Sequence, residues 1–316
     1  MGFKLLKVLE TVKVRFYHIP TEILKLLYLR LLALICNADL PPSISNLFNL
    51  QVLIIYPYMN IKKRGVQSYM PVQIWDLEEL QHIEIMGTDL PTPNTYDATL
   101  NKLITLLGVS ANSCTWEVLK RTPNLKRLSI HVELKPYDDD SDETNPLSCL
   151  SYISQLQNLV NLEYSIWNPE MKYELHTIPL SMFPSHLNDL RLRGLGYPWK
   201  YMNDIGSLLP NLQHLNLKSY AFRGPMWEIK PGSFLKLTTL QIKDTDLVQW
   251  RPQHGSFPEL KVLSMKHCYK LQQLDWPYDD SWIKVIELVE CNPLAVACAN
   301  QLKDKFSFEL MARSSF

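Results

Sequence analysis

Residues Leu40–Tyr56 read LPPSISNLFNLQVLIIY. The apolar residues of this stretch stand three positions apart and finally two apart, at Ile44, Leu47, Leu50, Leu53 and Ile55. Steps of three suit a tight segment whose successive turns face one interior, and the closing step of two suits a short strand with alternating faces. The stretch therefore predicts a turn that leads into a strand, with the pattern L-x-x-L-x-L.

This pattern, here called the frame, can be placed about twelve times along the chain. Its first positions are Leu6, Leu29, Leu50, Leu80, Leu103, Leu125, Leu159, Leu187, Leu212, Leu237, Leu260 and Ile283. Most intervals between them are 21 to 28 residues, which is the period of leucine-rich repeats. We expect an α/β leucine-rich-repeat solenoid of about twelve repeats, a curved horseshoe with a parallel sheet on its concave face and loops and short helices on its convex face.

The solenoid is expected to occupy residues 1–291, with inserted loops near 57–70 and 133–147. The second loop contains the acidic run KPYDDDSDETN, which we interpret as a solvated insertion. Residues 292–316 are expected to form a capping helix and a tail. Asn292 can cap this helix and Pro293 suits its first position, so that its apolar side would cover the open edge of the last repeat.

The composition narrows the possible functions. Lysine plus arginine equals aspartate plus glutamate, 32 each, which gives no global charge for nucleic acid or membranes. The sequence contains no run of 18 apolar residues, so it predicts no transmembrane helix. No phosphate loop, metal motif or nucleophile motif is present, so we expect no enzyme, no catalytic or metal-binding residue and no cofactor in this chain. The six cysteines lack paired spacing and are interpreted as reduced thiols, with Cys268 and Cys291 at the structural Asn/Cys position of the repeat.

Residues between the frame leucines are expected to point away from the core, onto the concave face. The fifth frame would expose Thr105, Leu107 and Val109 in this way. The early frames expose an apolar set, Leu31, Ala33, Ile35, Val52, Ile54 and Tyr56. Because an apolar surface should not face water, we expect this set to dock against another domain. The alternative is that these residues reflect strand preference alone.

The later frames expose a basic set, Arg127, His131, Arg191, Arg193, His214, Lys218, Lys243 and Lys266. We expect this set to bind an acidic protein partner, and the alternative is that it serves solubility. Nucleic acid is not expected as the partner, since no set of stacking aromatic residues is interleaved with the charges.

Several longer stretches carry a resemblance to a known family. They are YLRLLALICNADLPPSISNLFNLQVLIIY, MPVQIWDLEELQHIEI, NSCTWEVLKRTPNLKRLSI and CNPLAVACANQL. They resemble the C-terminal leucine-rich-repeat region of plant coiled-coil nucleotide-binding (NLR) disease-resistance proteins, specifically the nightshade late-blight resistance proteins. The resemblance covers essentially the whole chain.

The resemblance implies a cytoplasmic receptor, with peripheral membrane contact in its full-length form, that triggers defence and hypersensitive cell death. Its ATP or ADP would be bound by an upstream nucleotide-switch ATPase that is absent from this chain. The early frames would dock on the receptor's own ATPase and coiled-coil domains, and the later ones would bind a pathogen effector or a guarded host protein. The alternatives are a substrate-recruiting adaptor of a ubiquitin ligase, which would need an F-box before Leu6, and a truncated, non-functional remnant.

Overall fold

The computed structural model describes residues 4–36, 39–56, 70–88, 90–93, 98–133, 149–167, 182–276 and 283–314. The described chain forms two compact units, residues 4–132 with 149–159 (unit 1) and residue 133 with 160–314 (unit 2). Apart from their terminal residues, the loops predicted near 57–70 and 133–147 lie outside the described residues.

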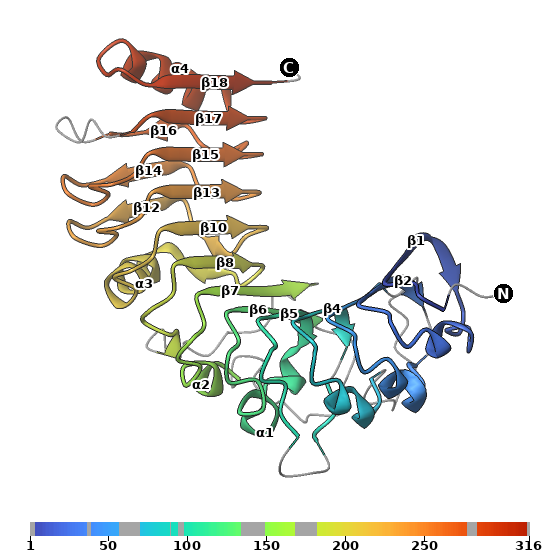
Figure 1. The fold of residues 1–316 in the computed structure, drawn as a ribbon. Coiled ribbons are helices and arrows are strands. Elements are labelled where there is room, and N and C mark those ends of the chain that lie inside the picture. The colour runs from blue at the N-terminus through green and yellow to red at the C-terminus, as the bar shows by residue number, and fades with distance from the viewer. Residues whose placement is uncertain are drawn as a thin grey trace, which may run out of the picture. The chain divides into compact units, whose positions relative to one another are not determined.

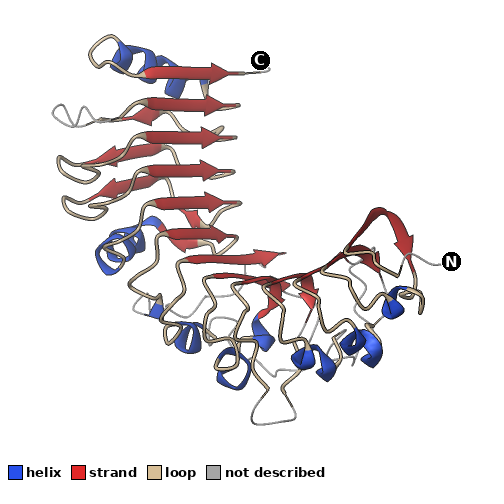
Figure 2. Cartoon of the chain, in the orientation of Figure 1, coloured by secondary structure: helices blue, strands red, loops and turns tan. Residues whose placement is uncertain are grey.

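In unit 1, one strand follows another in a parallel sheet. The strands are β1 (Val8–Phe16), β2 (Leu31–Cys36), β3 (Val52–Tyr56), β4 (His82–Thr88), β5 (Thr105–Ser110) and β6 (Arg127–Glu133). Short helices lie on the side of this unit opposite the strands (Figure 2): η1 (Ile23–Lys25), η2 (Pro42–Asn46), η3 (Val72–Asp76), η4 (Ala111–Ser113), α1 (Trp116–Leu119) and α2 (Leu150–Ile153). Pro41 and Pro71 precede η2 and η3 in extended conformation, which suits a proline at a helix start.

Unit 2 repeats this plan with strands that run side by side in one direction (Figure 1). Its main sheet contains β7 (Asn161–Trp167), β8 (Asp189–Arg193), β10 (His214–Lys218), β13 (Thr239–Lys243), β15 (Val262–Lys266), β17 (Val285–Val289) and β18 (Glu309–Arg313). Behind it lie β12 (Met226–Ile229), β14 (Gln249–Pro252) and β16 (Gln273–Leu274) as one sheet, and β9 (Tyr197–Pro198) with β11 (Phe222–Arg223) as another. The helices are η6 (Trp199–Tyr201), α3 (Met202–Leu208) and α4 (Pro293–Lys303).

Each of the twelve predicted frames contains one strand of a main sheet, so the fold prediction is confirmed. The frame leucines fill the core: Leu50, Leu53 and Leu80 have exposed fractions of 0%. The side chains between them point to the other face of each sheet, which we call the open face; it corresponds to the face predicted as concave.

The fifth frame departs from the prediction at Gly108. This residue has φ +76°, and an added Cβ would lie 2.2 Å from the carbonyl oxygen of Ile85. The pairing of β5 with β6 shifts between Leu106 and Val109, as in a β-bulge. Val109 is therefore fully buried at the third frame position, and the expectation that it is exposed was wrong.

The C-terminal tail contains the predicted helix and one further strand. Asn292 caps α4 by accepting a hydrogen bond from the backbone N–H of Leu294 at 2.9 Å, and Pro293 is the first helical residue. The edge of β17 is paired with β18, not covered by the helix as expected. The strand β18 was not predicted from the sequence. The predicted boundary at residue 292 remains a prediction.

Stacked aromatic rings link successive repeats of unit 2. The ring centroids of Trp199 and Trp227 are 4.9 Å apart, and those of Trp250 and Trp276 are 5.5 Å apart. Phe257 lies between, 6.3 Å from Trp227 and 6.0 Å from Trp250. These buried rings connect η6, β12 and β14, which belong to successive repeats, and so stiffen the unit.

Removal of one stacked ring tests this role. Trp227→Ala should lower the free energy of unfolding by about 3–5 kcal/mol, because it leaves a cavity in a fully buried stack. Trp116→Ala, at a site 38% exposed, should cost less than about 1 kcal/mol. Urea unfolding followed by circular dichroism measures both, and similar losses would contradict the stacking account.

A second pair of substitutions tests crowding at the strand ends. Gly194 has φ +70°, and an added Cβ would lie 2.2 Å from the carbonyl oxygen of Ile166; Gly232 has φ +74° with nothing within 4 Å. Gly232→Ala should cost about 1 kcal/mol for the left-handed backbone alone. Gly194→Ala should cost about 3 kcal/mol or more, because overpacking is added. Equal losses in urea unfolding would show that close packing at Gly194 is unimportant.

Candidate interaction face

The open face of unit 2 is ordered in rows, because the parallel strands pair in register. His214 of β10 is aligned with Asp189 of β8 and Thr239 of β13, and two positions on, Asn216 is aligned with Arg191 and Gln241. The row at the C-terminal end of the strands is Ser165, Arg193, Lys218, Lys243, Lys266, Val289 and Arg313. Neighbouring strands lie about 4.8 Å apart, so successive members of a row are direct neighbours.

Five members of this last row are cationic, and we call them the basic row: Arg193, Lys218, Lys243, Lys266 and Arg313. The first four were predicted from the sequence. Arg313 was missed, because the strand that carries this residue was not predicted. Like charges placed side by side across strands repel one another. The row therefore lowers the stability of the chain unless opposite charges are bound to it.

Two members of the basic row have partners within the chain. The guanidinium of Arg193 lies over the ring of Trp167, 3.7 Å from its centroid. The Nζ of Lys266 lies 2.9 Å from a carboxylate oxygen of Glu287. A hydrogen bond from Ser264, with a smaller contribution from Lys266, holds the pKa of the Glu287 carboxyl below its ordinary value.

The two central lysines of the row have no such partner. Lys218 and Lys243 form no ion pair with any residue that the structure describes. Lys218 is exposed and Lys243 is half-buried. They are therefore free to meet an acidic group from outside the chain.

Immediately after the row, the backbone of each strand turns into the left-handed region. Gly194, Ser219, Asp244, His267 and Glu290 have φ between 48° and 70°. The backbone N–H of each of these residues donates a hydrogen bond to the carbonyl oxygen of the row residue on the next strand. Ser219 donates in this way to Lys243 at 3.0 Å, and Asp244 to Lys266 at 3.1 Å. Non-glycine residues cost free energy in this conformation, and the inter-strand bonds offset that cost. This ladder fixes where the strands end and hence where the basic row lies.

Arg191 and His214 belong to the other rows, and their surroundings differ. Arg191 forms a two-bond ion pair with the buried carboxylate of Asp189, at 3.0 and 3.2 Å, and this contact raises the pKa of the guanidinium. His214 lines a shallow hollow of about 270 Å³, together with Asp189, Arg191, Leu215, Asn216, Thr239 and Gln241. Arg191 is already neutralised within the chain, whereas the central lysines are not.

Arg127 and His131 stand on β6 in unit 1, the first exposed and the second half-buried. The other six predicted basic residues lie in unit 2. The structure therefore brings Arg193, Lys218, Lys243 and Lys266 together in one row and leaves Arg127 and His131 in the other unit.

The early apolar set forms a compact block in unit 1. Leu31 is aligned with Val52, Ala33 with Ile54, and Ile35 with Tyr56. Ala33 is buried, so the expectation that this residue is exposed was wrong, while the other members are half-buried. We call these six residues the apolar block.

Charged and polar contacts border the apolar block. Glu10 is aligned with Ala33 on one side, and Glu84 with Ile54 on the other. The phenol of Tyr56 donates a hydrogen bond to Glu84 at 2.9 Å. Burial raises the pKa of Tyr56, and the nearby Glu84 carboxylate raises it further. The partly exposed apolar side chains of the block are thus bordered by carboxylates on the open face of unit 1.

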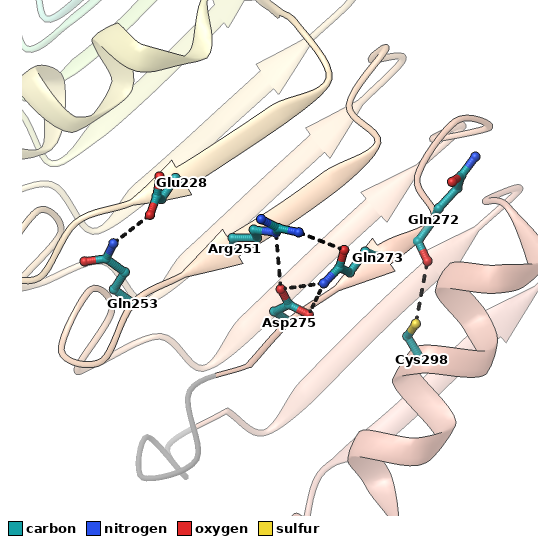
Figure 3. Close-up of polar contacts among 7 residues, drawn as sticks. All are labelled: Glu228, Arg251, Gln253, Gln272, Gln273, Asp275 and Cys298. Atoms are coloured by element: carbon teal, nitrogen blue, oxygen red, sulfur yellow. Dashed lines mark hydrogen bonds and ion pairs between the residues drawn. The ribbon is translucent and has the colours of Figure 1, made fainter.

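On the small sheet of β12, β14 and β16, behind the main sheet of unit 2, charged side chains are paired within the chain (Figure 3). Arg251 donates to Gln273 at 3.2 Å and lies 3.6 Å from Asp275, which also accepts from Gln273 at 2.9 Å. Glu228 accepts a hydrogen bond from Gln253 at 2.8 Å. Arg251 on this sheet is thus paired within the chain, unlike the central lysines of the basic row.

Two further features bear on the chemistry. None of the six cysteines forms a disulfide among the described residues, and five of them are buried. A hydrogen bond with Cys291, together with burial, raises the pKa of the Cys268 thiol, which suits the structural role predicted for these two residues. Among the residues that the structure describes, no cluster of three or more His, Cys, Asp or Glu side chains could hold a metal ion, and no helix has the length and apolar character needed to cross a membrane.

Comparison with known sequences supports the expected resemblance. The chain is 27% identical over 319 residues to two putative late blight resistance protein homologs of Solanum demissum, covering 96% of this chain and 22% of each relative. It is 27% identical over 316 residues to a third such homolog of the same plant, of which it covers 23%. The chain thus spans less than a quarter of the length of these relatives, and the predicted similarity to them is confirmed.

Comparison with solved structures supports the fold alone. An internalin of Listeria monocytogenes matches with a TM-score of 0.53 at 14% identity, covering 98% of this chain and 87% of that chain. A leucine-rich repeat protein of Leptospira interrogans matches with a TM-score of 0.50 at 18% identity, covering 97% of this chain and 73% of that chain.

The family model described as "Leucine-rich repeat region" matches residues 1–267. This match covers most of the 316 residues, including every strand from β1 to β15. The chain therefore belongs to the leucine-rich repeat region family.

Proposed function

We propose that this chain is the recognition and autoinhibition module of an intracellular plant immune receptor. In this proposal, the basic row binds a pathogen effector or a host protein that an effector modifies. The apolar block docks on an upstream nucleotide-switch ATPase, which binds the ATP or ADP, and release of that contact triggers defence and hypersensitive cell death. The receptor acts in the cytoplasm, and its repeat region is a binding surface that performs no catalysis.

Similarity to the Solanum demissum proteins supports the plant-immunity part of the proposal. Their names associate them with resistance to late blight, and the similarity extends over 96% of this chain. Because the chain spans only 22% of two of these relatives, most of their length is left for other segments with which a repeat region could interact.

The single observation that carries the recognition part is the pair of unpartnered lysines on the open face. Lys218 and Lys243 lie on adjacent strands of a packed sheet and meet no carboxylate among the described residues. A rigid surface loses little conformational entropy on binding, and charge that is unpaired beforehand steers an oppositely charged partner.

The apolar block supports the autoinhibition part. Leu31, Val52 and Ile54 adjoin one another and remain partly exposed to water. Burying this patch against a second domain would stabilise the closed receptor through the hydrophobic effect. A ligand then activates only as far as it binds the released state more tightly than the closed one.

The proposal predicts opposite phenotypes for the two surfaces when the gene that encodes this chain is edited in its own plant. Val52→Glu with Ile54→Glu should cause spontaneous leaf cell death, because a charged patch cannot hold the closed state. Lys218→Glu with Lys243→Glu should abolish the hypersensitive response to an isolate that the unedited plant resists, because the acidic partner is repelled. Ion leakage from leaf discs measures both responses.

Matched controls separate these effects from misfolding. Leu27→Glu with Phe48→Glu changes two exposed apolar residues of unit 1 that lie off the open face, and it should leave the response unchanged. Val8→Glu places a charge on the open face itself, at an exposed residue that is aligned with Leu31. It therefore tests docking of the apolar block with little risk to the core. The proposal is wrong if neither surface changes the response while the variant proteins accumulate normally.

A further inference from the structure

The chemistry of the basic row restricts the kind of partner that fits it. Arg193, Lys218, Lys243 and Lys266 stand on four consecutive strands, β8, β10, β13 and β15, in continuous register. They are the first four members of the basic row and form one continuous series of cations across the strands. The inference about the partner rests on the proposed function, in which the row binds a protein. It concerns the shape of the protein segment that the row binds.

An extended partner strand cannot join the sheet at this place. Each of the four strands is paired with a neighbour on both sides, so its backbone donors and acceptors are already used. Addition of a strand needs a free sheet edge. The partner must therefore bind through its side chains, lying on top of the row.

The spacing of the row matches a helix better than an extended chain. Three inter-strand intervals of about 4.8 Å span roughly 14 Å. Three turns of an α-helix span about 16 Å, and lysine side chains can take up the difference of about 2 Å. Same-side residues of an extended chain are about 6.6 Å apart, so three intervals span about 20 Å and fall out of step.

The rest of the open face limits how much negative charge the partner can carry. The neighbouring rows contain the carboxylates Glu163, Asp189, Glu287 and Glu309. A ligand with negative charge on all sides, such as a nucleic acid, would meet these groups as well as the cations. A helix with carboxylates along one stripe meets the cations and, of these four groups, only Glu287, which is paired with Lys266.

The polar hollow beside the row supplies a second feature. Asn216 and Gln241 precede Lys218 and Lys243 on the same strands, and their amides are joined by a hydrogen bond of 2.7 Å. Both residues line the hollow of about 270 Å³. Neutral polar side chains next to the acidic stripe of a helix could lie in this hollow without meeting a repelling charge.

We propose that the basic row binds an α-helix of a protein partner, with an acidic stripe along one side of the helix. The helix lies across β8, β10, β13 and β15 and carries one Asp or Glu per turn along one stripe, which faces Arg193, Lys218, Lys243 and Lys266. The side of the stripe over Asn216 and Gln241 is neutral and polar.

Synthetic helices test this geometry against the intact 316-residue chain. The probe is a stapled peptide of about 18 residues, roughly five turns, with glutamate at every third or fourth position along one stripe. A permuted peptide has the same composition and staple with its glutamates spread around the helix. Fluorescence anisotropy at low salt, with peptides matched in helicity by circular dichroism, gives the two dissociation constants.

The striped helix should bind at least about tenfold more tightly than the permuted one, since each exposed charge pair contributes about two- to fivefold. Lys218→Glu with Lys243→Glu should weaken its binding at least about tenfold. Lys200→Glu with Lys230→Glu makes the same charge change at exposed sites on η6 and just after β12, and should alter binding by less than about twofold.

Four results would overturn the inference. These are equal binding of the permuted helix, equal binding of a proline-containing extended peptide with the same glutamates, no binding of the striped helix up to about 1 mM, and an oligothymidylate that binds more tightly and displaces the helix. The last result would indicate a nucleic-acid partner.

The two proposals can fail independently. If no helix binds but the edited lysines still abolish the leaf response, the helix inference fails and the proposed function stands. If the striped helix binds through Lys218 and Lys243 but neither edited surface alters the leaf response, the helix site stands and the proposed function fails.

Discussion

Inter-strand register is the constraint on which the rest of this molecule depends. The N–H of His214 donates to the carbonyl of Asn188 at 2.9 Å, and Thr239 and Val262 repeat this contact with Gln213 and Thr238 at 3.0 Å. A strand of five residues is too short to be stable alone, so each one depends on its neighbours. A slip by one residue would turn frame leucines outward and row lysines inward, and burial of the leucines therefore holds the register. The same register that fills the core also aligns the cations.

The sequence predicted this architecture well because the information is local. The frame around Leu50 and Leu53 recurs with a steady period, and each copy indicates which of its residues are buried. Lys218 and Lys243 could be assigned to one face from alternation alone. The failures have a different origin. Val109 is buried because a bulge at Gly108 shifts the pairing of two strands, and Arg313 was missed because the tail lacks a recognisable leucine frame.

Side-chain contacts on the open face were the least predictable part of the candidate site. Nothing in the sequence near Arg191 shows that the neighbouring Asp189 is buried and neutralises it, while Lys218 lacks such a partner. Whether a cation on this face is paired with a carboxylate of the chain depends on the direction and burial of the side chains around it. Local patterns thus predicted the face, and only the three-dimensional structure distinguishes the satisfied cations on it from the unsatisfied ones.

The left-handed ladder after the strands has a consequence for how such a surface can diversify. The strands β8, β10, β13, β15 and β17 are all five residues long, and Gly194, Ser219, Asp244, His267 and Glu290 end them at the same level. An insertion of one residue within a strand would break this ladder and reverse the alternation, whereas a substitution at a row position leaves both intact. The open face is therefore a grid of fixed sites whose chemistry can change one side chain at a time. New binding preferences can arise there by point mutation, and changes in chain length must be accommodated elsewhere, in the connections between strands.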